Sequence, residues 1–344
     1  MITQEQKNNR QLAIWLLVCC GLIFSMVILG GATRLTGSGL SMVDWKPIMG
    51  AIPPLTEESW QETFSKYKNF PEYKKVNKGM SLDEFKSIFW YEYGHRLLGR
   101  TIGIVFLIPF LIFLALKKIK RELIPKLITM FLLGGLQGLL GWYMVKSGLV
   151  DNPRVSQYRL TAHLGAAVLI YGYILWVALG LLENSARRVT LHEVDHFRKL
   201  ALVVTTVIII MILSGGFVAG TRAGYVFNTF PLMYEYFIPP GMFAMEPWYM
   251  NLFENLATIQ FNHRMIAYAV IVLILILWFR IFNKAVTPGL RLASHLLLLM
   301  MMIQITLGIS TLVLVVPVAL GVAHQGGAIL LLTISLVLTH KLRK

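Results

Sequence analysis

Eight long apolar runs restrict what this chain can fold into. They cover about residues 12–31, 94–116, 124–145, 160–182, 199–219, 263–282, 292–315 and 319–340. Runs of roughly 17–25 apolar residues match the hydrocarbon thickness of a bilayer, and within lipid an α-helix satisfies all its own backbone polar groups. The chain is 56% hydrophobic and 14% charged, whereas globular domains carry about 25% charged residues. The sequence predicts an all-α membrane protein with eight transmembrane helices.

Basic residues cluster in alternate connections between these runs. The clusters are Lys117, Lys118, Lys120, Arg121 and Lys126; Arg187, Arg188, Arg198 and Lys199; Arg280, Lys284 and Arg291; and Lys341, Arg343 and Lys344. A formal charge of +15 alone is compatible with nucleic-acid binding, but this alternation is what the positive-inside bias predicts. We expect membrane lipid and no nucleic acid as partners, and both termini in the cytoplasm.

The only two cysteines, Cys19 and Cys20, are neighbours in the first apolar run. Adjacent residues point to different sides of a helix, so these two are poorly placed to pair. A disulfide framework is excluded and a structural zinc site is not expected. The polar N-terminus lacks a clear small-residue cleavage site, so the run 12–31 is expected to be a retained span.

The two halves of the chain repeat the same motifs. The matching segments are 92–96 (EYGHR) and 260–264 (QFNHR), 137–141 and 304–308, and the residues around His163 and His324. Each half has an even number of spans, which favours a repeat axis along the membrane normal. We predict two pseudo-symmetric four-helix bundles, an N-terminal half over 1–185 and a C-terminal half over 186–344.

Two long segments, 32–92 and 220–262, are predicted to be outer loops. Each has a Gly-Gly and a Thr-Arg near its start, and the first also contains Trp45-Lys46-Pro47 and Ile52-Pro53-Pro54. Ordered loops of this length are usually functional, and glycine lets a backbone approach a flat ligand closely.

Four of the eight histidines recur as two pairs at the heads of even-numbered runs: His95 with His163, and His263 with His324. A histidine in a membrane span is a functional-site hypothesis by default, and four at one depth favour metal ligation over isolated packed side chains. The other histidines are expected to be solvated or interfacial; they are His192, His196, His295 and His340.

Two imidazoles per half do not complete a tetrahedral zinc site. They do complete the ligands of a haem iron, because the macrocycle supplies the other four. Small residues are expected to open a slot for it between helices: Gly138, Gly141, Gly165, Ala166, Gly308, Gly326 and Gly327. Arginines on the same side are candidate propionate partners, although headgroup contact explains each equally well: Arg34, Arg96, Arg159, Arg222 and Arg264.

Glu92 is the most informative difference between the halves, because Gln260 occupies the matching position. On a helix Glu92 shares a face with His95, three residues later. Its carboxylate could orient a water or a protein group, act as a base or stabilise developing positive charge; the structural alternative is an acid favoured by the helix dipole. The difference favours a catalytic first half and an electron-transfer second half.

Several segments resemble the haem A synthase family, in its proteobacterial and mitochondrial branch, over nearly the whole chain. They are 30–41, 92–96, 158–164, 228–233 and 260–264. The resemblance implies an enzyme of the cell inner membrane that oxidises the C8 methyl of haem O to the formyl of haem A, the cofactor of haem-copper cytochrome c oxidases. It makes a haem O synthase and cytochrome oxidase assembly factors candidate partners.

The resemblance also implies roles for individual residues. His95 and His163 would ligate the substrate haem, with Glu92 as the catalytic residue. His263 and His324 would hold a permanent haem b that relays electrons. Some bacterial members carry a cysteine pair in the first outer loop, which this chain lacks there, so any redox role of that pair does not transfer.

Two other classes of protein are compatible with parts of the pattern. A di-haem b membrane electron-transfer cytochrome explains both histidine pairs but gives Glu92 no role. A transporter explains the repeat, but it predicts spans broken by glycine or proline at mid-membrane, whereas the special residues here lie near the outer ends.

Overall fold

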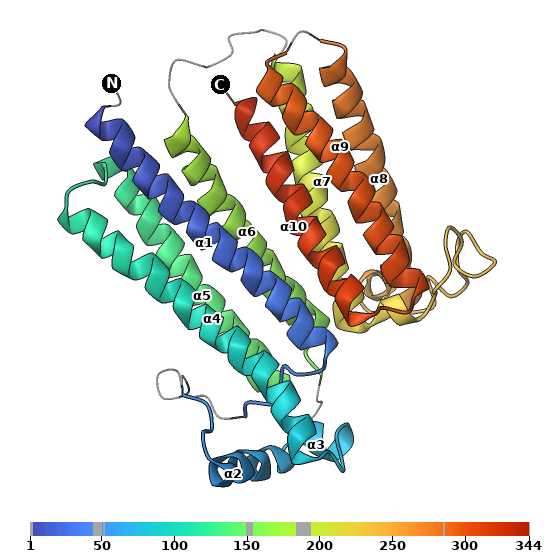
Figure 1. The fold of residues 1–344 in the computed structure, drawn as a ribbon. Coiled ribbons are helices and arrows are strands. Elements are labelled where there is room, and N and C mark those ends of the chain that lie inside the picture. The colour runs from blue at the N-terminus through green and yellow to red at the C-terminus, as the bar shows by residue number, and fades with distance from the viewer. Residues whose placement is uncertain are drawn as a thin grey trace.

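The computed structural model describes residues 3–43, 50, 52–148, 154–183, 194–284 and 286–343 (Figure 1). Within these residues eight helices are long and apolar enough to cross a membrane, and no strand is formed. They are α1 (Gln4–Leu35), α4 (Leu82–Ala115), α5 (Ile124–Gly148), α6 (Gln157–Leu182), α7 (Val194–Thr221), α8 (Leu256–Phe282), α9 (Pro288–Val313) and α10 (Val318–Lys341). The predicted all-α class and the eight spans are confirmed.

The spanning helices contact one another mainly within each half of the chain. In the first half α1 packs against α4 and α6, and α5 packs against α4 and α6. In the second half α7 and α9 each pack against α8 and α10. The halves meet where α1 and α6 contact α10 and where α6 contacts α7, and one apolar core runs through both (Figure 1). A pseudo-symmetric relation between the halves stays a prediction, and the predicted boundary at 185/186 lies outside the described residues.

The start of α1 and the end of α10 lie at the same end of the molecule (Figure 1). This end also carries the α4–α5 connection with its lysines and the α8–α9 connection. The outer segments α2, α3 and the α7–α8 connection lie at the opposite end. The predicted basic residues Arg187, Arg188 and Lys344 lie outside the described residues.

The helices extend beyond the apolar runs, because an apolar run marks only the part of a helix that lies in lipid. α4 shows this most clearly: it begins at Leu82, where Ser81 and Glu84 form a reciprocal capping box. The four histidines therefore lie inside their helices, although each lies near the start of its predicted apolar run. His95 lies thirteen residues after the first residue of α4, and the other three also lie inside their helices.

The first outer segment is partly helical rather than a simple loop. It contains α2 (Glu57–Lys68) and α3 (Pro71–Lys75), which pack on the first turns of α4 through an aromatic cluster. The buried members of this cluster are Trp60, Phe64, Tyr67, Phe85, Phe89 and Tyr93. The segment Trp45-Lys46-Pro47 lies outside the described residues. The cluster fixes the part of α4 that leads to Glu92 and His95.

The two cysteines are unpaired, as predicted, and two of the other histidines are exposed, as predicted. Cys19 and Cys20 are buried free thiols, and His196 and His295 are exposed. His340 was expected to be solvated or interfacial, but it is only 4% exposed, because it packs edge-on against the Trp176 ring of α6 with ring centroids 4.9 Å apart. His192 lies outside the described residues.

Candidate functional site

The first histidine pair joins α4 to α6, and each ring packs against a glycine of another helix in the same half. A Cβ atom added at Gly30 of α1 would lie 3.1 Å from Nε2 of His95. A Cβ atom at Gly141 of α5 would lie 3.1 Å from Cε1 of His163. The two imidazoles are close enough to interact electrostatically. All four helices of the first half therefore meet around this pair.

The second pair repeats this arrangement with His263 of α8 and His324 of α10. A Cβ atom at Gly215 of α7 would lie 3.4 Å from Cε1 of His263, and one at Gly308 of α9 would lie 2.8 Å from Cε1 of His324. These imidazoles also interact electrostatically. Among the glycines predicted to open a slot, Gly141 and Gly308 are the two that face a histidine ring.

The other predicted small residues have different neighbours. A Cβ atom at Gly138 would meet nothing within 4 Å, whereas Gly165 faces Leu213 and Gly327 faces Gln304. Gly326 packs against Ile28 of α1, at the junction between the halves. Gly165 and Gly326 therefore serve close helix packing, whereas Gly327 leaves room for Gln304, which donates to the His324 carbonyl.

Two glutamines at matching places in the repeat hold the second histidine of each pair. Gln137 Nε2 donates to the backbone carbonyl of His163 at 2.8 Å. Gln304 Nε2 donates to the backbone carbonyl of His324 at 2.9 Å and lies 3.1 Å from His324 Nδ1. The sequence repeat identified both glutamines as equivalent, but the contact to the histidine needed the structure.

The ring nitrogens show how these histidines could serve as ligands. Ser214 Oγ lies 3.1 Å from Nδ1 of His263. In the tautomer with its proton on Nδ1, His263 donates this bond and keeps the Nε2 lone pair for a metal. Nδ1 of His163 is buried and has no hydrogen-bond partner within the described part of the chain. Buried polar atoms without a partner are rare and call for a functional explanation.

The ligand set favours a haem over a bare metal ion. The described residues contain no group of three or more His, Cys, Asp or Glu side chains that could hold an ion. Each site instead offers two imidazoles, with a glycine leaving room beside each ring. Two axial histidines are a sufficient protein ligand set for an iron porphyrin, so the residues of both halves fit a haem.

Glu92 ties the first outer segment to α4 and is only 3% exposed. Its Oε2 accepts hydrogen bonds from Ser41 Oγ and from the Met42 backbone N–H, both at 2.8 Å. Its Oε1 accepts from Arg96 Nη2 at 2.5 Å, and Arg96 also donates to the Met42 carbonyl. The carboxylate is therefore fixed in place beside the His95 turn of α4. Sequence reasoning missed Ser41, although it lies at the end of the glycine-rich 30–41 motif.

Gln260 occupies the same place in the second half and is also 3% exposed. Its Oε1 accepts from Arg264 Nη2 at 3.1 Å, while its Nε2 donates to the Ala223 carbonyl at 2.8 Å. Arg264 further donates to the backbone carbonyls of Phe227, Thr229, Pro231 and Leu232. The two halves thus use one side-chain pairing to attach an outer segment, but only the first uses an acid.

The five candidate propionate arginines separate into three groups. Arg96 and Arg264 are held by protein groups as described above. The Arg159 guanidinium lies 4.7 Å from the centroid of the Tyr143 ring. Arg34 and Arg222 come from different halves yet line one cavity of about 570 Å³, together with Arg154. Arg222 adopts a left-handed backbone conformation at the start of the 3₁₀ helix η4 (Ala223–Tyr225).

Glu72 of α3 also lines this cavity, and no motif in the sequence pointed to it. It is 7% exposed, and its Oε2 accepts from the Tyr67 hydroxyl at 3.0 Å. Burial raises the pKa of Glu72 to about 7. The residue stands in a polar segment of the sequence, so only the packing of α3 against α2 reveals that it is buried.

Comparison with known proteins identifies relatives over nearly the full chain. The family model described as cytochrome oxidase assembly protein, COX15-CtaA, matches residues 13–336. The chain is 56% identical to the heme A synthase of Nitrosospira multiformis, covering 99% of this chain and 96% of the relative. It is 45% identical to the heme A synthase COX15 of Arabidopsis thaliana, covering 100% of this chain and 77% of the relative. The chain therefore belongs to the COX15-CtaA family of cytochrome oxidase assembly proteins.

Proposed function

We propose that this chain is a haem A synthase that binds haem O between His95 and His163 and oxidises its C8 methyl group to the formyl group of haem A. Relatives named heme A synthase cover nearly all of the chain. The observation that carries the assignment of the site is the difference between Glu92 and Gln260 at two otherwise matched positions. A carboxylate beside only one pair supports chemistry at that pair.

Glu92 acts in this proposal as a fixed acceptor of a proton released when the methyl group is oxidised. Three donors, from Ser41, Met42 and Arg96, hold its two oxygens in one position. Positioned carboxylates serve as general bases when they lie within reach of the reacting group. The same contacts hold Ser41 and Met42 of the first outer segment beside the His95 end of α4.

The second half would hold haem b between His263 and His324. A haem b held by these two histidines would supply one-electron transfer. Ser214 and Gln304 orient the two imidazoles from neighbouring helices. Gln260 is neutral, so it holds the outer segment without placing a carboxylate near the second pair.

Arg34 and Arg222 are the strongest candidates for propionate binding, because both residues line one cavity. Arginine binds carboxylates through paired, charge-assisted hydrogen bonds. Arg159 remains a further candidate from its place near the start of α6. Arg96 and Arg264 already donate to backbone carbonyls. In this proposal their main role is to hold the outer segments, and they are weaker candidates for propionate binding.

The location of the chain and its partners follow from the same proposal. Haem O is the substrate and haem A the product, with a haem O synthase as the supplier and oxidase assembly factors as recipients. The enzyme would lie in the cell inner membrane. Both termini would be cytoplasmic, because the basic connections lie at the end where the chain begins and ends.

A di-haem b electron-transfer cytochrome is the second candidate. The glycine and glutamine contacts shared by the two histidine pairs favour it, but it leaves the Glu92–Gln260 difference unexplained. A transporter is less favoured, because all eight spanning helices are continuous within the described residues, including α4, which contains Pro109.

Pigment extraction separates the enzyme from the cytochrome. The full chain is produced with a haem O synthase in a host that makes no haem A, and acid-extracted haems are separated by chromatography. The enzyme yields a formyl haem. Protohaem and haem O without any formyl haem, in protein that carries normal amounts of haem, would favour the cytochrome.

A further inference from the structure

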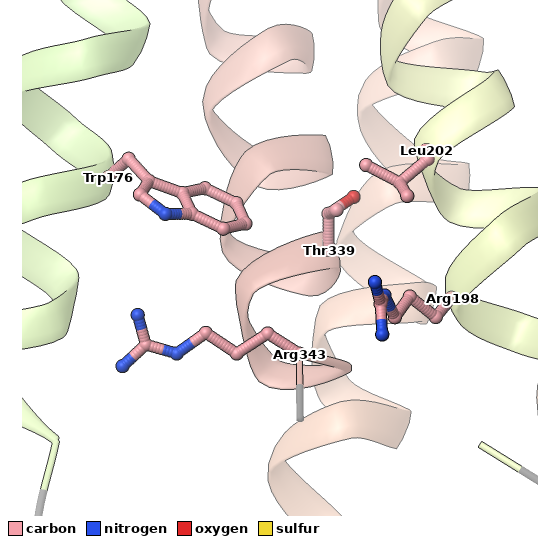
Figure 2. Close-up of a pocket in the computed structure, with 5 residues that line it drawn as sticks. All are labelled: Trp176, Arg198, Leu202, Thr339 and Arg343. Carbon is pink, nitrogen blue, oxygen red and sulfur yellow. The ribbon is translucent and has the colours of Figure 1, made fainter. Parts of the chain in front are cut away.

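A second cavity lies far from the histidine pairs, at the end of the molecule that carries both termini. Figure 2 shows it between α6, α7 and α10, with a volume of about 240 Å³. Its lining residues are Trp176, Arg198, Leu202, Thr339 and Arg343. Trp176 belongs to the first half and the other four to the second. The cavity is therefore part of the junction between the halves.

The cavity is flanked by two guanidinium groups. Arg198 of α7 and Arg343, just beyond α10, extend along two sides of it in Figure 2. Glu183 binds Arg343 through one carboxylate oxygen, which accepts from Nε at 3.1 Å and from Nη2. Along the chain here, five basic residues (Arg198, Lys199, Lys341, Arg343 and Lys344) outnumber the three acids Glu183, Glu193 and Asp195. The excess positive charge favours an anion, and guanidinium groups suit phosphate oxygens.

A polar atom beside Arg343 still lacks a partner. Nε2 of His340 is buried and has no hydrogen bond within the described part of the chain. A Cβ atom added at Gly180 would lie 3.9 Å from this nitrogen and 3.4 Å from Nη1 of Arg343, so the two groups lie on the same small patch of α6. An oxygen-bearing ligand or a water there would satisfy His340.

The hydroxyl of Thr339, which lines the cavity, already has a hydrogen-bond partner. Thr339 Oγ1 lies 3.0 Å from Thr205 Oγ1, which in turn lies 2.8 Å from Ser335 Oγ. This buried hydroxyl cluster joins α7 to α10. Recognition of an anion therefore falls to the arginines rather than to Thr339.

The apolar part of the lining indicates which anion fits. Leu202 of α7 is 44% exposed, and the Trp176 indole lies on the other side of the cavity (Figure 2). In a spanning helix, such an exposed leucine faces acyl chains. We propose that the cavity binds the phosphate of an anionic phospholipid between Arg198 and Arg343, with acyl chains along Leu202. Basic pockets between spanning helices on the cytoplasmic side suit such headgroups. The lipid would then bridge α6, α7 and α10 and stabilise the junction between the halves.

The test measures lipid binding by the purified full chain in a neutral detergent. Dioleoylphosphatidylglycerol, dioleoylphosphatidylcholine and soluble glycerol 1-phosphate are titrated separately, and binding is followed by native mass spectrometry and by the thermal unfolding midpoint. We expect saturable binding and a raised midpoint with phosphatidylglycerol alone. Arg198→Gln should weaken that binding about tenfold, because it removes a charged hydrogen-bond donor to the phosphate.

Two further variants keep the result interpretable. The double variant Glu183→Gln/Arg343→Gln removes the second guanidinium without leaving Glu183 unpaired, and it should also weaken binding. Arg280→Gln, on the exposed side of α8 at the same end, is the matched control and should bind like the unaltered chain. All variants should keep their haem content. Equal binding of phosphatidylcholine, equal stabilisation by glycerol 1-phosphate, or unchanged binding by Arg198→Gln would overturn the proposal.

Discussion

Glu92 accepts a hydrogen bond of 2.5 Å from Arg96, one turn further along α4. The same pairing joins Gln260 to Arg264 on α8, at 3.1 Å. In both halves the arginine also donates to backbone carbonyls of an outer segment. This shared pairing attaches each outer segment to the helix that carries the first histidine of a pair. The carboxylate is the chemical difference between two sites that are otherwise built alike.

Glu92→Gln tests that difference. The amide oxygen can still accept from Arg96, but the amide N–H₂ group cannot accept from the Met42 N–H. We expect haem content to stay near normal while the yield of formyl haem falls about 100-fold, the lower end of the usual contribution of general acid–base catalysis. Extracted haems, separated by chromatography, provide the measurement.

Ser41→Ala is the matched control for this variant. It removes one donor to Glu92 and leaves the carboxylate, so haem A yield should fall only slightly. An unchanged yield of haem A in Glu92→Gln would remove the proposed role of the acid.

Gly308→Val tests whether the glycine beside His324 is needed for the second site. Even a Cβ atom there would lie 2.8 Å from the imidazole, so a larger side chain must displace the ring. We expect loss of the b-type absorption band with the fold retained. Gly141→Val should act in the same way on the first site, where the distance is 3.1 Å.

Gly138→Val provides the control, because a Cβ atom at Gly138 meets nothing within 4 Å. It lies on the same helix as Gly141, one turn earlier. If Gly138→Val and Gly141→Val reduced haem content equally, general helix packing rather than contact with His163 would explain the loss.

Gln304→Leu tests the hydrogen bond that holds His324. Its removal should cost on the order of 1 kcal/mol and let the imidazole rotate. The low-spin signal of the second haem in electron paramagnetic resonance should shift, with haem content largely kept. Gln61→Leu, on the exposed face of α2, should leave the signal unchanged, and a signal that is identical in Gln304→Leu would contradict the positioning role.

Glu72 is expected to make the stability of the folded chain depend on pH. Burial raises its pKa to about 7 from its ordinary value of 4.5, so between these pH values the folded chain keeps a proton that the unfolded chain releases. Protonated Glu72 thereby contributes to the free energy of unfolding, on the order of 3 kcal/mol. This contribution is complete below pH 4.5 and is lost as the pH rises to about 7. Thermal unfolding across this range should show the midpoint falling as the pH rises.

Glu72→Gln should flatten this dependence, because the amide does not ionise. Glu58→Gln, exposed on α2, should keep the slope of the unaltered chain. The same slope in Glu72→Gln as in the unaltered chain would show that another group is responsible.

The features that could be predicted from the sequence are those that depend on the length of the apolar runs and on the internal repeat. The eight spans follow from run length, and the equivalence of Gln137 with Gln304 follows from an offset nearly equal to that between the two His-Arg pairs. Helix starts were predicted less well. α4 begins at Leu82, and its first turns are aromatic and charged, because they pack against α2 and α3 rather than against lipid. An apolar run predicts only the part of a helix that lies in lipid, so it cannot predict where α4 begins.

Contacts between distant segments were also beyond the sequence. Ser41 meets Glu92 across 51 positions, and Arg34 and Arg222 line one cavity from different halves. His340 and Glu72 are polar residues near chain ends or in polar segments, where exposure is the usual expectation, yet each is buried by an aromatic neighbour, Trp176 and Tyr67 respectively. Burial of this kind depends on tertiary packing rather than on local composition.

The central claim is that each half holds one haem iron between its own two histidines. The most direct test is a reduced-minus-oxidised spectrum, with haem extraction, of purified His163→Ala and His324→Ala made with a haem O synthase. His324→Ala should lose the b-type haem and keep haem O, while His163→Ala should lose haem O and keep the b-type haem. Loss of the same haem in both variants, or an unaltered spectrum in either, would contradict the claim.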